Sequence, residues 1–201
     1  MRIKVLIILI IIGLKVNSQL DKRFITFFYK PKVSFFSTDN DDFKSNRHPL
    51  IKNDIGINLY LLKKEKFKFV IGLIYANKGW EDEYYDLTVK RNYSYIDIPL
   101  VFDYILLKNK KLSIHIPVGL VPEILIDYDK KTKINDKKYD IDSKYIGKWD
   151  NTCIYLGLSL NYILNEKICV IIEPNLNYQI GMFEHRRFYD IGIKLGIGYG
   201  F

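Results

Sequence analysis

The chain closes with the sequence YDIGIKLGIGYGF, residues 189–201. Every second residue is large and apolar, and the residues between them are Asp190, Lys194 and four glycines. Successive side chains of a β-strand point to opposite faces, so one face of this strand is a continuous apolar stripe. The other face is small or charged. Apolar residues outside and a crowded polar interior are typical of a small β-barrel in lipid.

Seven earlier segments have the same two-residue alternation or a strongly apolar character. They are residues 24–36, 54–62, 67–78, 93–106, 112–127, 152–163 and 168–182. Segments of about ten residues with this pattern are the expected mark of a transmembrane barrel. The connections between them are alternately long and short, as in an antiparallel meander with long outer loops and short periplasmic turns. We therefore predict an all-β fold, an eight-stranded antiparallel up-and-down transmembrane β-barrel formed by residues 19–201 as one domain.

The start of the chain has the pattern of a cleavable signal peptide. Arg2 and Lys4 precede an apolar run over residues 5–14, and Ser18 is a small residue suited to a cleavage site. The predicted signal peptide is residues 1–18, followed by a chain exported to the outer membrane. The alternative is an uncleaved anchor, but the run is shorter than the roughly 20 apolar residues that a spanning helix needs.

The formal net charge is +8 and is spread along the chain among acidic residues. Nucleic-acid binding needs a concentrated basic stripe, so it is not expected. We expect the positive charge to attract anionic lipid head groups instead. The two cysteines, Cys153 and Cys169, fall on neighbouring predicted strands but well apart along them, beyond the reach of a disulfide. We expect two free thiols that face inward, with Cys153 opposite Asn177 or Gln179.

The segment YIDIPL, residues 95–100, resembles the corresponding strand of the PorT-like small outer-membrane barrels of Bacteroidota. The Ser18–Gln19 junction is also similar to cleavage sites in that family. The resemblance implies a small barrel of the cell envelope, and one class in the family takes part in protein secretion. The terminal aromatic residues Tyr199 and Phe201 resemble the signal read by the barrel assembly machinery. Five prolines depart from the expected strand pattern, namely Pro31, Pro99, Pro117, Pro122 and Pro174.

An eight-stranded barrel leaves an interior just wide enough for side chains, so charges placed there should pair with one another. Alternation turns inward the residues Lys30, Lys32, Lys68, Asp97, Asp103, His115, Glu123, Glu173 and Lys194. We expect a closed polar interior rather than an open pore, with a proton or ion path as the alternative. A turn centred on Asn109 would place Asp103 opposite His115, and Lys194 should find an acidic partner.

The candidate contact surface is basic. It comprises Lys130, Lys131, Lys133, Lys137 and Lys138 of the long connection 128–151, together with Arg186 and Arg187. These residues suggest a structural or interaction role, with loops that contact a protein partner, a glycan or lipopolysaccharide. No catalytic residue, metal site or cofactor is predicted. One alternative is a lipid A-modifying enzyme that uses Ser45 and His48. Another is a soluble lipocalin-like binder of a small ligand, which requires the apolar faces to point inward.

Overall fold

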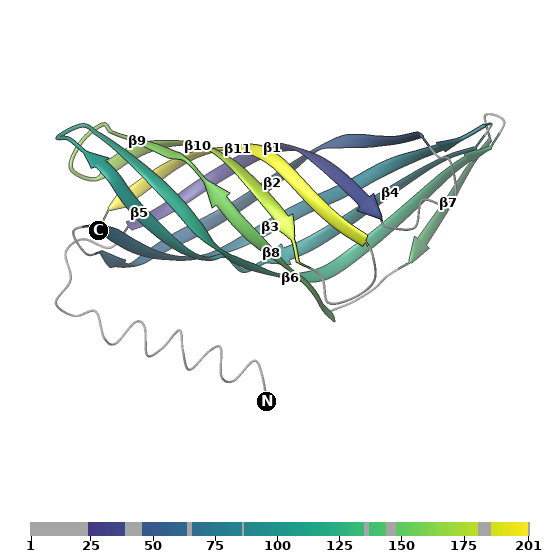
Figure 1. Ribbon diagram of the computed structural model, residues 1–201, viewed down its shortest axis with the longest axis horizontal. Helices are drawn as coiled ribbons and strands as arrows, with labels where there is room; N and C mark the ends of the chain where they lie inside the picture. The colour runs from purple at the N-terminus through teal and green to yellow at the C-terminus, as the bar shows by residue number, and fades with distance from the viewer. Residues whose placement is uncertain are drawn as a thin grey trace.

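The computed structural model describes residues 24–38, 46–63, 66–85, 87–134, 137–143, 148–180 and 186–200. These residues form eleven strands, which are β1 (Phe24–Thr38), β2 (Asn46–Lys63), β3 (Phe67–Tyr84), β4 (Leu87–Asp97), β5 (Leu100–Lys108), β6 (Leu112–Ile134), β7 (Lys137–Ser143), β8 (Lys148–Gly157), β9 (Ser159–Ile163), β10 (Ile168–Gln179) and β11 (Arg186–Gly200) (Figure 1). The predicted signal peptide and Phe201 lie outside the described residues.

The strands close into a ring. β11 pairs with β1 over its whole length, from Phe24 opposite Gly200 to Thr38 opposite Arg186. Strands β4 and β5 follow one another along a single course, as do β8 and β9, so the ring has eight antiparallel courses. β7 lies off the ring and pairs with the end of β6. The predicted eight-stranded barrel is confirmed, and so is the seam between its first and last strands.

The two interruptions of the ring lie beside prolines. The gap between β4 and β5 contains Pro99, and there the N–H of Ile98 donates to the carbonyl of Pro122 at 2.9 Å. The gap between β8 and β9 is Leu158, whose N–H donates to the carbonyl of Pro174 at 3.0 Å. Proline has no N–H to return, so the ladder keeps one bond where a regular pair has two. The wall therefore remains continuous around the strand-internal prolines.

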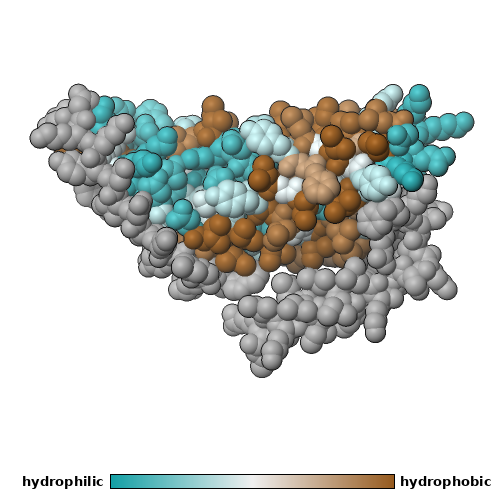
Figure 2. Space-filling view, turned by 180° about the vertical axis from the view of Figure 1, so that it is seen from behind, coloured by the Kyte–Doolittle hydropathy of each residue, from teal (hydrophilic) through white to brown (hydrophobic). Residues whose placement is uncertain are grey.

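Polar groups face the inside of the barrel and aliphatic groups face out. On β11, Ile191, Ile193, Leu195 and Ile197 are exposed, whereas Lys194 is only 6% exposed. On the face drawn in Figure 2, apolar side chains cover a broad middle region, with polar surface toward both ends. A soluble lipocalin-like protein would need the opposite arrangement, with the apolar residues inside. No helix among the described residues is long and apolar enough to span a membrane.

The barrel has two different ends. The near end, at the left of Figure 1, holds the start of β1, the end of β11 and the short turns after β2, β5 and β9. The far end, at the right, holds the hairpins β3–β4 and β6–β7. The strands reach further toward the far end than predicted. Residues 46–53, 79–84, 87–92 and 128–134 were assigned to loops, but they continue β2, β3, β4 and β6.

Bulges change which side chains face inward near the far end. The β4–β6 register shifts between Ser94 and Tyr95. Beyond this shift Asp127 is exposed, although it has the same parity as the buried Glu123 and Leu125. Tyr93 stacks against Trp80 with ring centroids 5.5 Å apart. Other aromatic residues are exposed on the outer surface, namely Phe67, Tyr75, Tyr104, Tyr162, Tyr178 and Tyr199.

Candidate functional site

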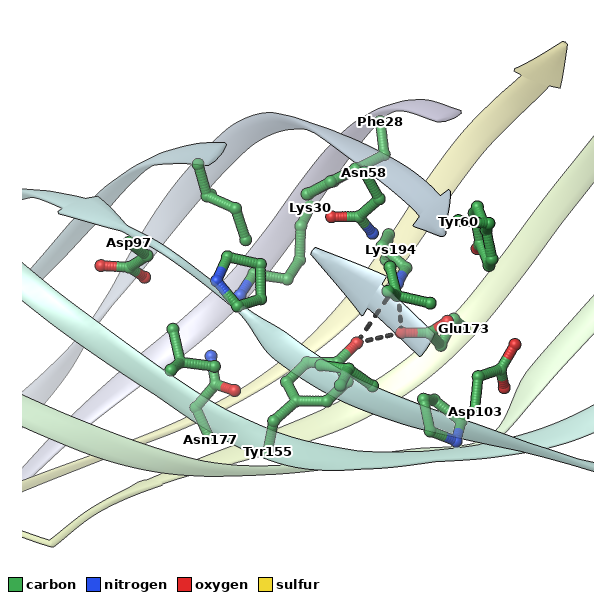
Figure 3. A pocket seen from close by; sticks show the side chains of 16 residues that line it. Phe28, Lys30, Asn58, Tyr60, Asp97, Asp103, Tyr155, Glu173, Asn177 and Lys194 are labelled. Carbon is green, nitrogen blue, oxygen red and sulfur yellow. Dashed lines mark hydrogen bonds and ion pairs between the residues drawn. The ribbon is translucent and has the colours of Figure 1, made fainter. Parts of the chain in front are cut away.

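One ion pair in the barrel interior joins neighbouring strands. Lys194 of β11 and Glu173 of β10 are direct partners in the ladder, and Nζ lies 2.5 Å from Oε1. The hydroxyl of Tyr155 donates to the same carboxylate oxygen and accepts a hydrogen bond from Lys194 Nζ at 3.4 Å. The three side chains converge in the barrel lumen (Figure 3). Lys194 thus has the acidic partner that alternation predicted for it.

A second cluster lies toward the near end. His115 Nδ1 is 2.9 Å from Asp103 Oδ2, and His115 Nε2 is 2.8 Å from Ser113 Oγ. Lys68 Nζ approaches the same Asp103 oxygen at 3.9 Å. Asp103 and His115 therefore share a face and touch, as expected. Their register differs from the prediction, because Asp103 lies opposite Pro117 and His115 lies opposite Ile105.

Toward the far end, two lysines of β1 form ion pairs with carboxylates of the neighbouring strands. Asp54 lies 2.6 Å from Lys30 Nζ and 2.9 Å from Lys32 Nζ. Lys32 also contacts Asp190 at 3.1 Å, so the pairs join β2, β1 and β11. Asp54 was not predicted as part of the interior network, because it stood at the edge of its predicted strand. Continuing the two-residue alternation from Asn58 and Gly56 would have assigned it to the inner face.

Lys78 is another interior charge that the sequence analysis did not single out. It is 1% exposed and its Nζ lies 2.5 Å from Glu123 Oε1. Cys153 donates to the same oxygen at 3.0 Å. Lys78 has the same parity as Lys68, so the alternation of β3 places it inward. Its position at the end of the predicted strand concealed this role.

Asp97 lines a cavity, unlike the ion-paired carboxylates described above. It lies opposite Glu123 across the β4–β6 ladder, and its Oδ1 is buried without a hydrogen-bond partner among the described residues. About 30 Å³ of the cavity admits a water-sized sphere, which is enough for an ordered water. Asn58 and Asn177 also line it, each with a buried carbonyl oxygen that has no partner in the described part of the chain. Ordered water is the natural partner for such groups.

Both cysteines are free and buried, as predicted. Cys153 lies opposite Gln179 across the β8–β10 ladder, which is one of the two expected partners. Cys169 lies opposite Ile163 of β9 and Gly198 of β11. In the described residues, no group of three or more His, Cys, Asp or Glu side chains is placed to hold a metal ion.

An aromatic cap crosses the lumen beyond these ion pairs. It consists of Phe36, Trp80, Tyr93 and Phe188. The rings of Phe36 and Trp80 stack with centroids 3.8 Å apart, and Phe188 meets Trp80 edge-on at 5.4 Å. Trp80 and Phe188 are 4% and 6% exposed. The cap separates the charged interior from the far-end mouth.

The basic residues of the predicted contact loop lie on strands. Lys130, Lys131 and Lys133 belong to β6, and Lys137 and Lys138 belong to β7, where Lys138 is opposite Lys133. Arg186 begins β11, and the neighbouring Arg187 donates to the hydroxyl of Tyr178 at 3.0 Å. Tyr199 is exposed on the outer surface near the end of β11. The region predicted as an open loop is thus largely a β6–β7 hairpin.

The enzyme alternative rested on Ser45 and His48. His48 lies on β2, and its Nε2 is 3.3 Å from Glu83 Oε2 at an exposed position. Ser45, the other residue of the pair that would make a nucleophile and base, lies outside the described residues.

Comparison with known structures agrees with this architecture. OprG, an outer membrane protein of Pseudomonas aeruginosa, matches with a TM-score of 0.52 at 12% identity, over 90% of this chain and 96% of that chain. Ail, the attachment invasion locus protein of Yersinia pestis, matches with a TM-score of 0.45 at 12% identity, over 90% and 98%. The outer membrane protease OmpT of Escherichia coli matches with a TM-score of 0.47 at 7% identity, over 92% and 99%. No curated protein sequence matches the chain.

A closed antiparallel ring with aliphatic residues outside and ion pairs inside defines a transmembrane β-barrel of the outer membrane. The family model for the outer membrane protein beta-barrel domain matches residues 18–201. The chain belongs to this family.

Proposed function

We propose that this barrel has a structural and interaction role in the outer membrane, and that its far end contacts a protein partner, a glycan or lipopolysaccharide. The observation that carries the proposal is the length of the far-end strands. A strand needs about 9–11 residues to cross the membrane. β6 has 23 residues and β2 and β3 have 18 each, so all three continue well past the apolar band. An extension of this length presents a rigid surface beyond the bilayer.

The interior supports the same proposal. Lys32, Lys78 and Lys194 are all buried and ion-paired, and the aromatic cap lies between them and the mouth. An eight-stranded barrel has little room to spare for a solute to pass. Such an interior favours a rigid closed support over a pore. The surface that remains for function is then the far-end extension and its basic residues.

A finer placement follows from the strand motif. We infer that the chain belongs among the PorT-like barrels of Bacteroidota and serves as an accessory component of a secretion or envelope complex. The support is the sequence of residues 95–100, in which Pro99 forms the strand interruption that faces Pro122. The barrel assembly machinery is the expected partner during biogenesis, through Tyr199 and Phe201. Deleting Phe201 should lower the amount of folded barrel in the membrane.

Site-specific crosslinking tests the interaction role. A photo-reactive residue at Lys131, on the far-end extension, should give adducts in intact cells of the native host. The same residue at Lys110, in the near-end turn, is the matched control because both positions are exposed lysines. Adducts at position 131 that exceed those at 110 support the proposal. Equal yields, or no adduct at 131, contradict it.

A further inference from the structure

The mouth cluster comprises Arg47, Asp82, Arg91 and Lys130, and it lies on the inner face of the far-end extension. Arg47 is opposite Asp82 across the β2–β3 ladder, and Arg91 is opposite Lys130 across the β4–β6 ladder. Arg91 is also opposite Trp80, whose ring belongs to the aromatic cap. Residues directly opposite in a ladder share a face, so the four side chains point into the mouth above the cap.

The cluster carries more positive charge than it neutralises. Asp82 accepts from Arg47 Nε at 3.0 Å, from Trp80 Nε1 at 2.8 Å and from Arg91 Nη1. No ion pair joins Lys130 to another described residue. Two guanidinium groups thus bind one carboxylate, and Lys130 adds a third positive charge opposite Arg91. Like charges directly opposite on a sheet are destabilising, so the pair of Arg91 and Lys130 is costly without an anion between them.

Asp82 and the cap hold the guanidinium groups in place. Arg91 lies 5.2 Å from the ring centroid of Trp80, and Arg47 lies 5.0 Å from that of Phe36. A guanidinium has five N–H donors, and the bonds to Asp82 use one from each arginine. The two arginine side chains remain 23% and 22% exposed, whereas Asp82 is 4% exposed. Fixed guanidinium groups with donors to spare match the oxygens of a phosphate group.

We propose that the mouth cluster binds a phosphate group carried by a soluble molecule outside the cell. Arg47 and Arg91 donate to the phosphate oxygens and Lys130 supplies a third positive charge. The inner face of the extension is turned away from the surrounding bilayer, so the ligand enters from the aqueous phase rather than from the lipid head groups. The cap keeps the ligand at the mouth, because stacked rings close the lumen beneath it. This inference rests on the proposed interaction role and names one ligand class for it.

The test is calorimetric titration of the folded barrel, in nonionic detergent micelles, with inositol hexakisphosphate as a soluble phosphate ester. Saturable binding is expected. Arg91→Gln and Lys130→Gln should each weaken it about tenfold, the value of a hydrogen bond to a charged group. Lys110→Gln makes the same charge change at the near-end turn and should leave the affinity within about twofold, because exposed charges are screened.

Lys130→Gln keeps the test valid if Arg91→Gln fails to fold, since Lys130 has no ion pair with another described residue to lose. Absence of saturable binding, or equal weakening by Lys110→Gln and Lys130→Gln, overturns the inference. A second arm places the barrel in vesicles that contain lipid A. Unchanged affinity for the soluble probe supports entry from the aqueous phase, and competition by lipid A overturns it. Crosslinks at Lys131 without phosphate binding would remove this inference alone and leave the proposed interaction role standing.

Discussion

Neutralising Lys194 gives the sharpest test of the interior. Its Nζ lies 2.5 Å from Glu173 Oε1, and the two side chains are 7% and 3% exposed. Removing one partner of a buried pair leaves an uncompensated charge and costs about 3–5 kcal/mol. Lys194→Met keeps the apolar stem of the side chain. The loss in the free energy of unfolding then measures the effect of removing the charge. Glu173 would retain only the hydrogen bond from Tyr155.

The double variant Lys194→Met with Glu173→Gln is the control. It removes both charges, and Gln still accepts the hydrogen bond from Tyr155. Replacing a buried pair by neutral groups is often close to neutral, so we expect a cost within about 1 kcal/mol of wild type. The double variant should therefore be about 2–4 kcal/mol more stable than Lys194→Met alone.

Urea titration of the folded barrel in lipid vesicles, followed by tryptophan fluorescence and gel mobility, measures these free energies of unfolding. A loss below about 1 kcal/mol for Lys194→Met would show that water solvates Glu173 in the lumen. A double variant no more stable than Lys194→Met alone would refute the ion pair as a coupled unit.

Three further outcomes follow from the geometry. The unfolded chain should react with a thiol reagent at both Cys153 and Cys169, to the same extent with and without reductant, while the folded barrel reacts slowly; a gain of thiols on reduction would contradict free cysteines. Leu195→Arg on the outer face should cost about 2–4 kcal/mol of stability in a bilayer, far more than Leu195→Ala, and equal losses by urea titration would contradict lipid exposure. Gly119→Ala should destabilise by about 1–3 kcal/mol because the added Cβ would lie 2.7 Å from the Cα of Val101, and an unchanged midpoint of unfolding would contradict this packing.

The membrane-spanning part of the fold was readable from the sequence because lipid imposes a strict rule. Each strand must turn its aliphatic residues outward within the bilayer, and period-two alternation follows. Residues beyond the bilayer need not turn aliphatic side chains outward, and the far-end extensions of β2, β4 and β6 therefore show no apolar–polar alternation. Asn46, His48 and Pro49 show no apolar alternation, yet backbone pairing with β3 keeps them in a strand. Backbone hydrogen bonds between strands do not depend on side-chain hydrophobicity, so the hydrophobicity pattern cannot predict them.

The sequence predicted which charged side chains point into the barrel, but it predicted less well which residues lie opposite one another across the strands. Lys194 and Glu173 were placed correctly because parity alone turns both inward. Asp103 and His115 share a face for the same reason, but their register is shifted by two residues. The turn pairs Lys108 with Ser113, so its centre lies between Lys110 and Lys111 rather than at Asn109. A one-residue irregularity between Ile105 and Leu107 then leaves a net shift of two residues, which keeps the facing unchanged. The mouth cluster could not be predicted, since it depends on how far β2 and β4 extend.

Membrane fractionation with heat-modifiable gel mobility tests the central claim most directly. The chain should remain in the outer-membrane fraction after extraction at alkaline pH, because its apolar band needs lipid around it. An unheated sample should migrate differently from a boiled one, as the closed ring of hydrogen-bonded strands resists unfolding until it is heated. Recovery of the chain as a soluble periplasmic protein, with the same mobility before and after boiling, would contradict the barrel in lipid.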